Sequence, residues 1–249
     1  MLSKSQINLL RSLQEKKSRL DNNVFLVEGE KMVSELILSN LSIRQVYVNK
    51  DISEESMELF SKGLKNTEMV SLGRDTMQKI SMHSTAPSVI ALVEIPDYGF
   101  LEMQGPVLVL DEIQDPGNLG TLIRIADWFH FGGIFCSKGT VSWHNPKVIQ
   151  SSMGSFIRIP IREGDIREYL STCKRRIYGA SLTGGSIYQE NISDLEILVL
   201  GNESKGISED VQSYIQNLIR IPGFGQAESL NVAVAGGIIC SEFIRQRQQ

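Results

Sequence analysis

Three short segments combine glycine with amide, carboxylate, hydroxyl and guanidinium side chains. Each segment belongs to, or ends, a loop that follows a stretch expected to be a buried or short strand. The segments are Asn118-Leu-Gly-Thr-Leu-Ile-Arg124, Gly201-Asn-Glu203 and Ser229-Leu-Asn-Val232. Glycine permits tight turns and exposes the backbone to a ligand, and ligands of open parallel sheets collect at the carboxyl ends of the strands. We therefore take these loops as the candidate functional site.

Arg124 is the cation of this set. It follows Gly117 by seven residues and Gly120 by four, so all three lie on one side of a helix. Helical side chains lean towards the N-terminus, which lets the guanidinium reach back to the loop. Pro116-Gly-Asn118 is equally well explained as a turn, with Arg124 as an ordinary surface cation. If the side chain were buried in its apolar surroundings, it would require a partner.

Two helix starts are expected next to these polar groups. Ser229 is the expected N-cap of a C-terminal helix over 229–246, and Asn118 can cap a helix over 118–130. The C-terminal helix contains Gly236 and Gly237, and each interior glycine costs about 1 kcal/mol relative to alanine. Another element or a ligand must approach this helix closely, although packing on a sheet alone would also explain small residues.

Several common enzyme motifs are missing. Lys205 precedes Gly206, whereas a phosphate-binding Walker loop requires Gly-Lys-Ser/Thr after four spacer residues. The sequence has no Gly-x-Gly-x-x-Gly after its first buried strand and no Gly-x-Ser-x-Gly elbow. These absences disfavour a Rossmann-type nucleotide enzyme and a serine hydrolase.

The three segments, together with Ile221-Pro222, resemble the signature motifs of the SpoU (TrmH-like) RNA 2′-O-ribose methyltransferases of the SPOUT superfamily. The resemblance covers residues 106–245 and includes an Asn145-Pro-Lys147 segment. Phe25-Leu-Val-Glu-Gly-Glu30 resembles, more loosely, the small RNA-binding domain of the family. The segment Gly223-Phe-Gly-Gln226 departs from the shorter, Met-containing loop of many relatives.

The resemblance implies S-adenosylmethionine as cofactor, a deep trefoil knot and a homodimer that acts on RNA. It places the cofactor, with its adenine in apolar surroundings, on backbone groups around Leu200, Gly201, Ile221 and Leu230. It implies Arg124 as the central catalytic residue. A guanidinium is effectively always protonated, so we expect Arg124 to bind a phosphate and orient the 2′-hydroxyl rather than act as the base. The polar groups expected to orient Arg124, the RNA or the loop are Asn118, Glu203, Ser229 and Asn231.

The charge distribution points to possible RNA surfaces. The net charge is −4, yet residues 1–50 carry eight Lys/Arg against five acids, and residues 138–176 carry eight against three. Such segments are often simply solvated faces, but two of them can also attract phosphates. The expected RNA-binding residues are Lys16, Lys17, Arg19 and Lys147.

The pattern of apolar residues predicts an α/β protein with two domains. We expect a small RNA-binding α/β domain over 1–95, a linker over 96–105 and a methyltransferase α/β domain over 106–249. Within them, helices are expected over 4–17, 145–153 and 207–217, and strands over 68–72, 107–110 and 158–161. No apolar run is long enough to span a membrane, and a cytoplasmic protein is expected. The three cysteines and three histidines form no ligand-spaced cluster, so no metal is expected.

The sequence therefore predicts S-adenosylmethionine-dependent methylation of a ribose 2′-hydroxyl in RNA, in ribosomal RNA rather than transfer RNA. A catalytically silent, dimeric RNA-binding or ribosome-assembly protein of the same fold is the alternative. Five polar residues argue against this alternative, because a binding protein need not retain all of them. They are Asn118, Arg124, Glu203, Ser229 and Asn231.

Overall fold

The computed structural model describes residues 2–64, 67–99 and 103–248, which form two compact units. Unit 1 comprises Met1–Asp97 and His144–Ile157, and unit 2 comprises Tyr98–Trp143 and Arg158–Gln249. The chain therefore passes between the units after residues 97, 143 and 157. Residues 100–102 of the expected linker lie outside the described residues. None of the described helices is long and apolar enough to cross a membrane.

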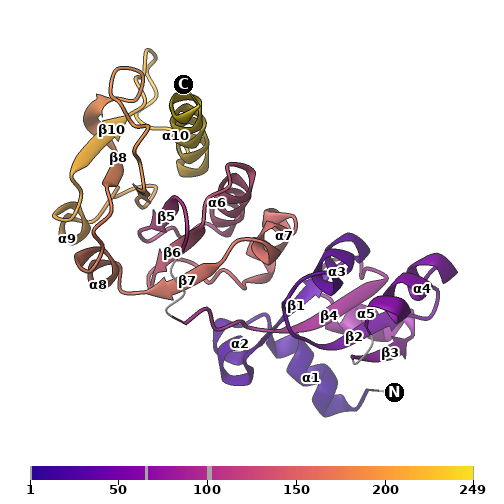
Figure 1. Cartoon of the computed structure of the whole chain (residues 1–249). Coiled ribbons are helices and arrows are strands. Elements are labelled where there is room, and N and C mark those ends of the chain that lie inside the picture. The colour runs from indigo at the N-terminus through magenta and orange to yellow at the C-terminus, as the bar shows by residue number, and fades with distance from the viewer. Residues whose placement is uncertain (1, 65–66, 100–102, 249) are drawn as a thin grey trace. The chain divides into compact units, whose positions relative to one another are not determined.

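Unit 1 is built on a four-stranded sheet of order β1-β4-β2-β3, in which β2 and β3 are parallel and the other pairs are antiparallel (Figure 1). Its strands are β1 (Val24–Glu28), β2 (Ile43–Asn49), β3 (Glu68–Leu72) and β4 (Val89–Glu94). Its helices are α1 (Lys4–Ser12), α2 (Lys16–Asn22), α3 (Glu30–Ile37), α4 (Glu54–Gly63), α5 (Arg74–Ile80) and α7 (Pro146–Ser152), the last followed by the 3-10 turn η1 (Ser155–Ile157).

The core of unit 1 explains two departures from the expected pattern. Leu10 and Leu13 pack with α5 residues against one face of the sheet, and the helix expected over 4–17 is interrupted between them and Lys16. The Arg19 guanidinium donates to the carbonyls of Leu13 (2.8 Å) and Gln14 (2.7 Å), which compensates for the broken helix. Helix α7, expected in the methyltransferase domain, packs instead with β1 of unit 1.

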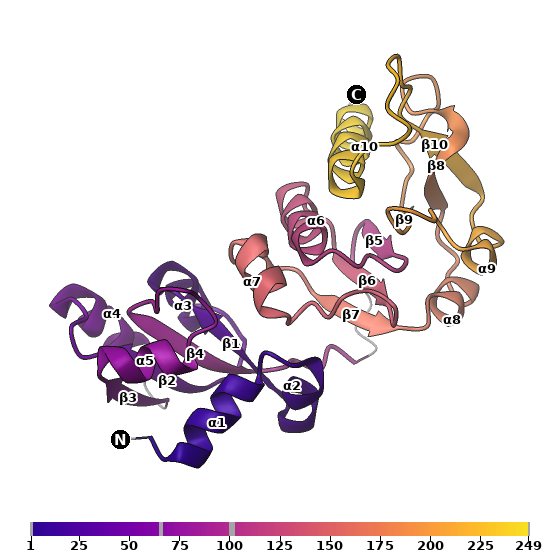
Figure 2. The same ribbon diagram turned by 180° about the vertical axis from the view of Figure 1, so that it is seen from behind.

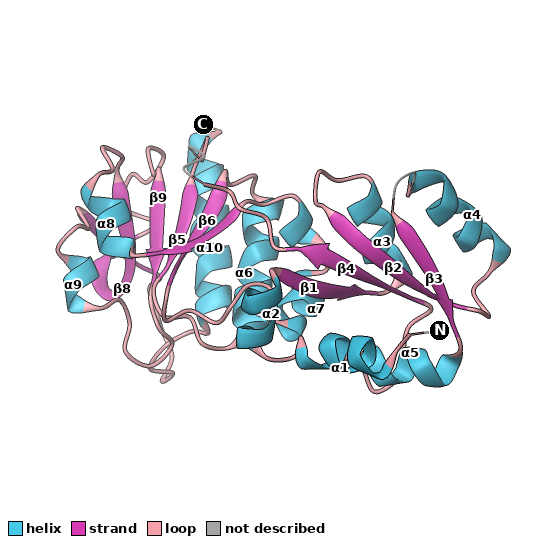
Figure 3. Ribbon diagram, turned by 90° about the horizontal axis from the view of Figure 1, so that it is seen from below, coloured by secondary structure: helices cyan, strands magenta, loops and turns pink. Residues whose placement is uncertain are grey.

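Unit 2 is a six-stranded, fully parallel sheet of order β10-β8-β9-β5-β6-β7 (Figures 2 and 3). Its strands are β5 (Val107–Leu110), β6 (Gly133–Ser137), β7 (Ile161–Gly164), β8 (Ile177–Ser186), β9 (Ile197–Leu200) and β10 (Asn217–Arg220). Its helices are α6 (Pro116–Trp128), α8 (Ile166–Ser171), α9 (Glu209–Gln212) and α10 (Val232–Arg247). Together with unit 1, this sheet confirms the predicted α/β class.

Helices α6 and α10 lie side by side in unit 2 (Figure 1). A Cβ added to Gly236 would come within 2.9 Å of Leu122 on α6 and 3.0 Å of Leu200 on β9. These distances are shorter than ordinary van der Waals contacts. Leu122 and Leu200 of the same unit therefore make the close approach to α10 that its glycines predicted.

Two elements of unit 2 differ from their expected ranges. The strand expected over 158–161 begins only at Ile161, because Pro160 has no backbone N–H to donate to the ladder. The carbonyl of Pro160 still accepts from Ile134 at 2.9 Å. The helix expected over 207–217 is reduced to α9, which begins after Ser208.

Candidate functional site

The loops after β5 and β9 meet at the carboxyl edge of the parallel sheet. Leu110 and Leu200, the last residues of these neighbouring strands, are paired in register. The Asp111 N–H donates to the Leu200 carbonyl at 2.9 Å, and the Asp111 carboxylate accepts from the Ser208 N–H at 2.9 Å. Asn202 Nδ2 donates to the Glu112 carbonyl at 2.8 Å. The two loops are thus joined by backbone and side-chain hydrogen bonds.

A chain of side-chain hydrogen bonds joins the three polar segments. Asn231 Nδ2 donates to Asn118 Oδ1 at 2.8 Å, and Asn118 Nδ2 donates to Glu203 Oε1 at 2.8 Å. These residues are 113 and 85 positions apart along the chain, so only the fold brings them together. We call Asn231, Asn118 and Glu203 the amide network.

The helix caps differ from those expected at Asn118 and Ser229. Asp115 caps α6 by accepting from the Asn118 N–H at 2.9 Å, with Pro116 at the first helical position. Asn231 caps α10 by accepting from the N–H groups of Ala233 and Val234. Both expected caps were wrong: Asn118 lies inside its helix, and Ser229 lies in the exposed loop before α10.

Arg124 is exposed on α6, six residues after Asn118. Among the described residues, its guanidinium has no hydrogen-bond or ion-pair partner. The structure therefore does not bring Arg124 into the amide network. Because the guanidinium is exposed, it does not require the partner that a buried cation would need. All five guanidinium N–H donors remain available to an anionic ligand.

The residues expected around the cofactor lie beside the amide network in the chain. Leu200 is buried at the end of β9, Ile221 is half-buried after β10, and Leu230 is 49% exposed directly before Asn231. A Cβ on Gly201 would collide with the backbone of Gly206 and Ile207, so this position requires glycine. The loop after β9 depends on that close approach.

The loop over 221–230 contains many backbone and side-chain groups that make no hydrogen bond within the described part of the chain. None of its residues makes a hydrogen bond with another described residue, and Phe224 is 97% exposed. Free backbone donors and acceptors beside exposed apolar side chains suit a ligand with both polar and apolar parts. This donor set fits S-adenosylmethionine.

The expected RNA-binding residues divide into two groups. Lys16, Lys17 and Lys147 are exposed in unit 1. Arg19 is only 1% exposed, and its Nε donates to His144 Nδ1 at 2.9 Å. The expectation that Arg19 lies on an RNA surface was wrong, because its guanidinium is used inside the unit to hold carbonyls and an imidazole.

Some residues that shape the site escaped sequence reasoning. Asp111 and Asn202 hold the two loops together, and Asp115 caps α6. Asp115 directly before Pro116 was a detectable signal, because proline favours the first helical position. Asn202 bonds to a residue 90 positions away, and no local pattern marks such a contact. Among the described residues, no group of three or more His, Cys, Asp or Glu side chains is arranged to hold a metal ion.

Two family matches cover most of the chain. Residues 105–241 match the SpoU rRNA Methylase family, and residues 4–91 match the MRM3-like substrate binding domain. The first match contains the whole amide network and Arg124.

Relatives with similar sequences and structures point to the same family. The 23S rRNA (guanosine(2553)-2′-O)-methyltransferase RlmP of Bacillus subtilis is 32% identical over 233 residues, which cover 92% of each chain. A proposed RNA methyltransferase of the TrmH family from Porphyromonas gingivalis is 34% identical, with a TM-score of 0.85 and complete coverage of both chains.

The SpoU methyltransferase AviRb from Streptomyces viridochromogenes, solved with AdoMet, has the same fold at 22% identity, with a TM-score of 0.89 over 99% of both chains. Together with the sequence matches, this confirms the predicted resemblance. The chain belongs to the SpoU rRNA methylase family.

Proposed function

We propose that this protein transfers a methyl group from S-adenosylmethionine to a ribose 2′-hydroxyl of ribosomal RNA. The observation that carries the proposal is the amide network, which joins the three family motifs through Asn231, Asn118 and Glu203. The likeness to RlmP over 92% of both chains supports 23S rRNA as the substrate. The proposed location is the cytoplasm, because the relatives named as rRNA methyltransferases come from bacteria.

The cofactor would be held by the loops that follow β9 and β10. Backbone groups of Gly201 and of residues 221–230 would bind its polar parts, and Leu230 and Phe224 would cover apolar ones. When bound, S-adenosylmethionine supplies a methyl group made electrophilic by its positively charged sulfur. The protein's own contribution is to hold these loops in place, and the amide network supports this because Asn231 directly follows the loop.

Arg124 would bind a phosphate of the RNA. A guanidinium with free donors makes charge-assisted, bidentate bonds to phosphate oxygens. Such a contact would fix the ribose so that its 2′-oxygen meets the methyl group in line, and positioning of this kind lowers the barrier strongly. Glu203 and Asn118 would orient the neighbouring loop, and Ser229 would contact the RNA or the cofactor.

Methyl transfer to the 2′-oxygen would require the hydroxyl to give up its proton to an acceptor at the site. Arg124 is a poor acceptor for that proton, because a guanidinium stays protonated. Glu203, Asn231 and Arg124 are all exposed. Water can therefore reach the site and take the proton, directly or through a neighbouring group.

Unit 1 would bind the RNA outside the reacting nucleotide. The match of residues 4–91 to a substrate binding domain supports this role, and Lys16, Lys17 and Lys147 supply exposed positive charge in the same unit. Binding through these lysines should weaken as salt increases, because phosphate contacts release counterions.

The proposed assembly is a homodimer formed through the face made by α6 and α10. Ile125, Val234, Gly237 and Ile238 line an apolar hollow there, and Val234 is 51% exposed. An exposed apolar surface of this kind is typical of a protein–protein interface. A trefoil knot is also proposed, supported by the likeness to SpoU methyltransferase structures.

Transfer of labelled methyl groups from S-adenosylmethionine to unmodified ribosomal RNA tests the function. The wild type should transfer label, and Arg124→Ala should transfer it at least about 100-fold more slowly, while calorimetry shows that both bind the cofactor. Cofactor binding and RNA binding without any transfer by the wild type would favour the catalytically silent alternative.

A further inference from the structure

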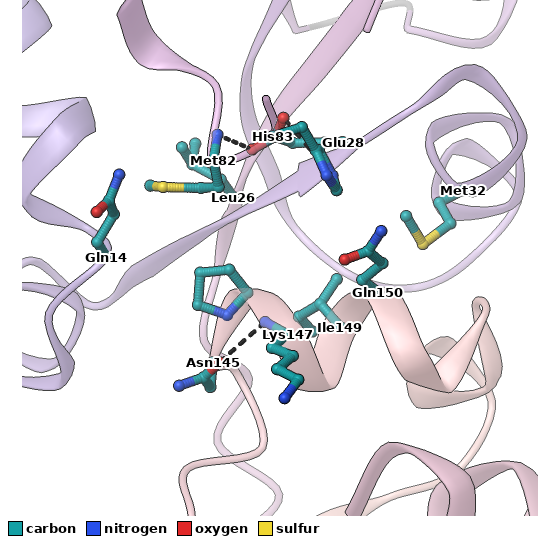
Figure 4. A pocket seen from close by; sticks show the side chains of 11 residues that line it. Gln14, Leu26, Glu28, Met32, Met82, His83, Asn145, Lys147, Ile149 and Gln150 are labelled. Carbon is teal, nitrogen blue, oxygen red and sulfur yellow. Dashed lines mark hydrogen bonds and ion pairs between the residues drawn. The ribbon is translucent and has the colours of Figure 1, made fainter. Parts of the chain in front are cut away.

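A pocket in unit 1 shares no residue with the amide network. It has a volume of ≈ 290 Å³ and is formed by β1, α7, the segment after α1 and the loop after α5 (Figure 4). All of its lining residues belong to the two segments that make up unit 1. Its volume is near the lower end of the range for small-molecule sites. A single planar ring system suits such a space.

The wall formed by the loop after α5 is firmly held. The Glu28 carboxylate accepts from Ser81 Oγ at 2.6 Å and from the Met82 N–H at 2.7 Å. Gln78 Nε2 donates to the His83 carbonyl at 3.1 Å, and the His83 N–H donates to Ser81 Oγ at 3.0 Å. The pocket therefore exists before any ligand arrives, which reduces the entropy lost on binding.

The lining combines apolar surface with groups that can bind the edge of a base. Leu26, Met82 and Ile149 provide apolar and thioether contacts, and a methionine sulfur packs well against aromatic rings. In the view of Figure 4, Gln14 and Gln150 lie on either side of Met82. Each glutamine amide offers both donors and an acceptor, which matches the mixed edge of a nucleobase.

Lys147 adds a positive charge at the same pocket. Its side chain is exposed, and its ammonium has no ion-pair partner in the described part of the chain. A pocket that combines apolar side chains with amide groups, beside a free cation, has the chemistry of a nucleotide site, where the base enters the pocket and the phosphate meets the cation. Sequence-specific RNA recognition commonly uses unpaired bases splayed out in this way.

We propose that this pocket binds one unpaired nucleobase of the substrate RNA, with a flanking phosphate on Lys147. The proposal rests on the proposed function insofar as RNA is the substrate. The bound nucleotide differs from the one that is methylated, because no lining residue belongs to the amide network or includes Arg124. The pocket would select substrates by requiring an unpaired nucleotide in addition to the one that is methylated.

Binding of fluorescein-labelled RNA of mixed sequence, measured by anisotropy as single strand and as duplex, tests the proposal. Gln150→Ala should weaken single-strand binding roughly fivefold, because an edge hydrogen bond is lost, and should leave duplex binding unchanged. Gln150→Trp, which fills the pocket, should weaken single-strand binding as well. Gln189→Ala, an exposed glutamine of unit 2, is the matched control and should bind as the wild type does.

Lys147→Ala should lower the slope of log affinity against log salt by about 0.7, the value for one phosphate contact with a single strand. Lys79→Ala, from the same unit but outside the pocket lining, should not change that slope. Circular dichroism and calorimetry with S-adenosylmethionine show that each variant is folded and binds the cofactor.

Equal single-strand affinity in wild type and both Gln150 variants would overturn the proposal, as would equal weakening of single strand and duplex. A failure of the proposed function can be distinguished from a failure of the pocket proposal. If the wild type transfers no methyl group while the Gln150 variants still lose single-strand affinity, the pocket stands and the enzymatic activity does not.

Discussion

Asn118 connects all three motif loops through a single amide. Its Oδ1 accepts from Asn231, and its Nδ2 donates to Glu203. An aspartate at this position keeps the acceptor but loses the donor, and it places a second carboxylate against Glu203. The network therefore depends on an amide, and neither alanine nor aspartate can replace it.

Asn118→Asp should lower kcat/KM at least as much as Asn118→Ala, by about 100-fold, because displaced loops misplace the reacting groups. Asn40→Asp, at an exposed asparagine of unit 1, is the control for the change in charge. Steady-state methylation kinetics measure the effect. Wild-type activity in Asn118→Asp would mean that the network has no role in catalysis.

Arg124 has a different role, which its free guanidinium makes testable. If it binds a phosphate, Arg124→Ala should lower kcat/KM by about 100-fold or more, and Arg124→Lys should retain part of the activity as a point charge. The pH profile of Arg124→Lys should keep the wild-type shape. Recovery of full activity by the lysine variant at raised pH would instead indicate a titrating base at this position.

The chemical types of the site residues were predictable from sequence, but their partners were not. Glycine and polar residues after strands predicted Asn118, Glu203 and Asn231 as site residues, and the fold joins these three by hydrogen bonds. Ser229 and Asn231 are both good caps, and Asn231 forms the cap of α10 while its Nδ2 also bonds to Asn118. Such long-range contacts leave no local signal.

At the scale of elements, α7 is held in unit 1 by a buried polar contact at its start. Arg19 Nε donates to His144 Nδ1, so the neutral imidazole carries its proton on Nε2. The pKa of His144 is lowered from 6.5 to about 3, first by burial and then by the charges of Arg19 and Lys16. The folded chain therefore keeps this histidine neutral.

This burial makes the stability of the chain depend on pH. The unfolded chain takes up a proton on His144 below about pH 6.5, while the folded chain resists until about pH 3. Neutral His144 contributes fully to the free energy of unfolding above pH 6.5. This contribution is lost as the pH falls through the window, by at most about 1.4 kcal/mol per pH unit.

Urea unfolding at several pH values between 4 and 7.5 should show a shallower pH dependence for His144→Asn than for the wild type. His130→Asn, at an exposed histidine, should keep the wild-type dependence. The same slope in both variants would show that His144 is not the group responsible.

Most element positions followed from the apolar pattern, and the exceptions have identifiable causes. The strands over 68–72 and 107–110 have the expected bounds. Where the first helix is divided, Arg19 binds the carbonyls left free at the break, and β7 begins late because of Pro160. Only the proline is visible in the local sequence.

At the scale of the whole molecule, the proposed homodimer would bury the apolar face formed by α6 and α10. Val234→Asp places a charge on the apolar face without harming α10, because a carboxylate in the first turn is favoured by the helix dipole. By light scattering, the wild type should be a dimer and the Val234→Asp variant a monomer.

Leu182→Asp, at another exposed apolar residue of unit 2, should leave the dimer intact. A monomeric wild type, or a dimeric Val234→Asp, would contradict the proposed interface.

The division of the chain into units 1 and 2 could be predicted only in part from the sequence. The change of composition after residue 95 marks a boundary close to the one between Asp97 and Tyr98. The transfer of His144–Ile157 to unit 1 was not expected, because α7 follows β6 in a regular strand–helix rhythm. Its packing depends on buried contacts with residues far away in the chain, such as the T-shaped pair of Phe25 and Phe156.

The central claim is methylation of a ribose hydroxyl, and nucleoside mass spectrometry of reacted 23S rRNA tests it most directly. Unmodified transcript is incubated with the wild type and S-adenosylmethionine, digested, and compared with the Arg124→Ala reaction. The wild-type reaction should yield a 2′-O-methylnucleoside, and Arg124→Ala should form it at least about 100-fold more slowly. A methyl group found on a base, or an equal yield from the variant, would contradict the claim.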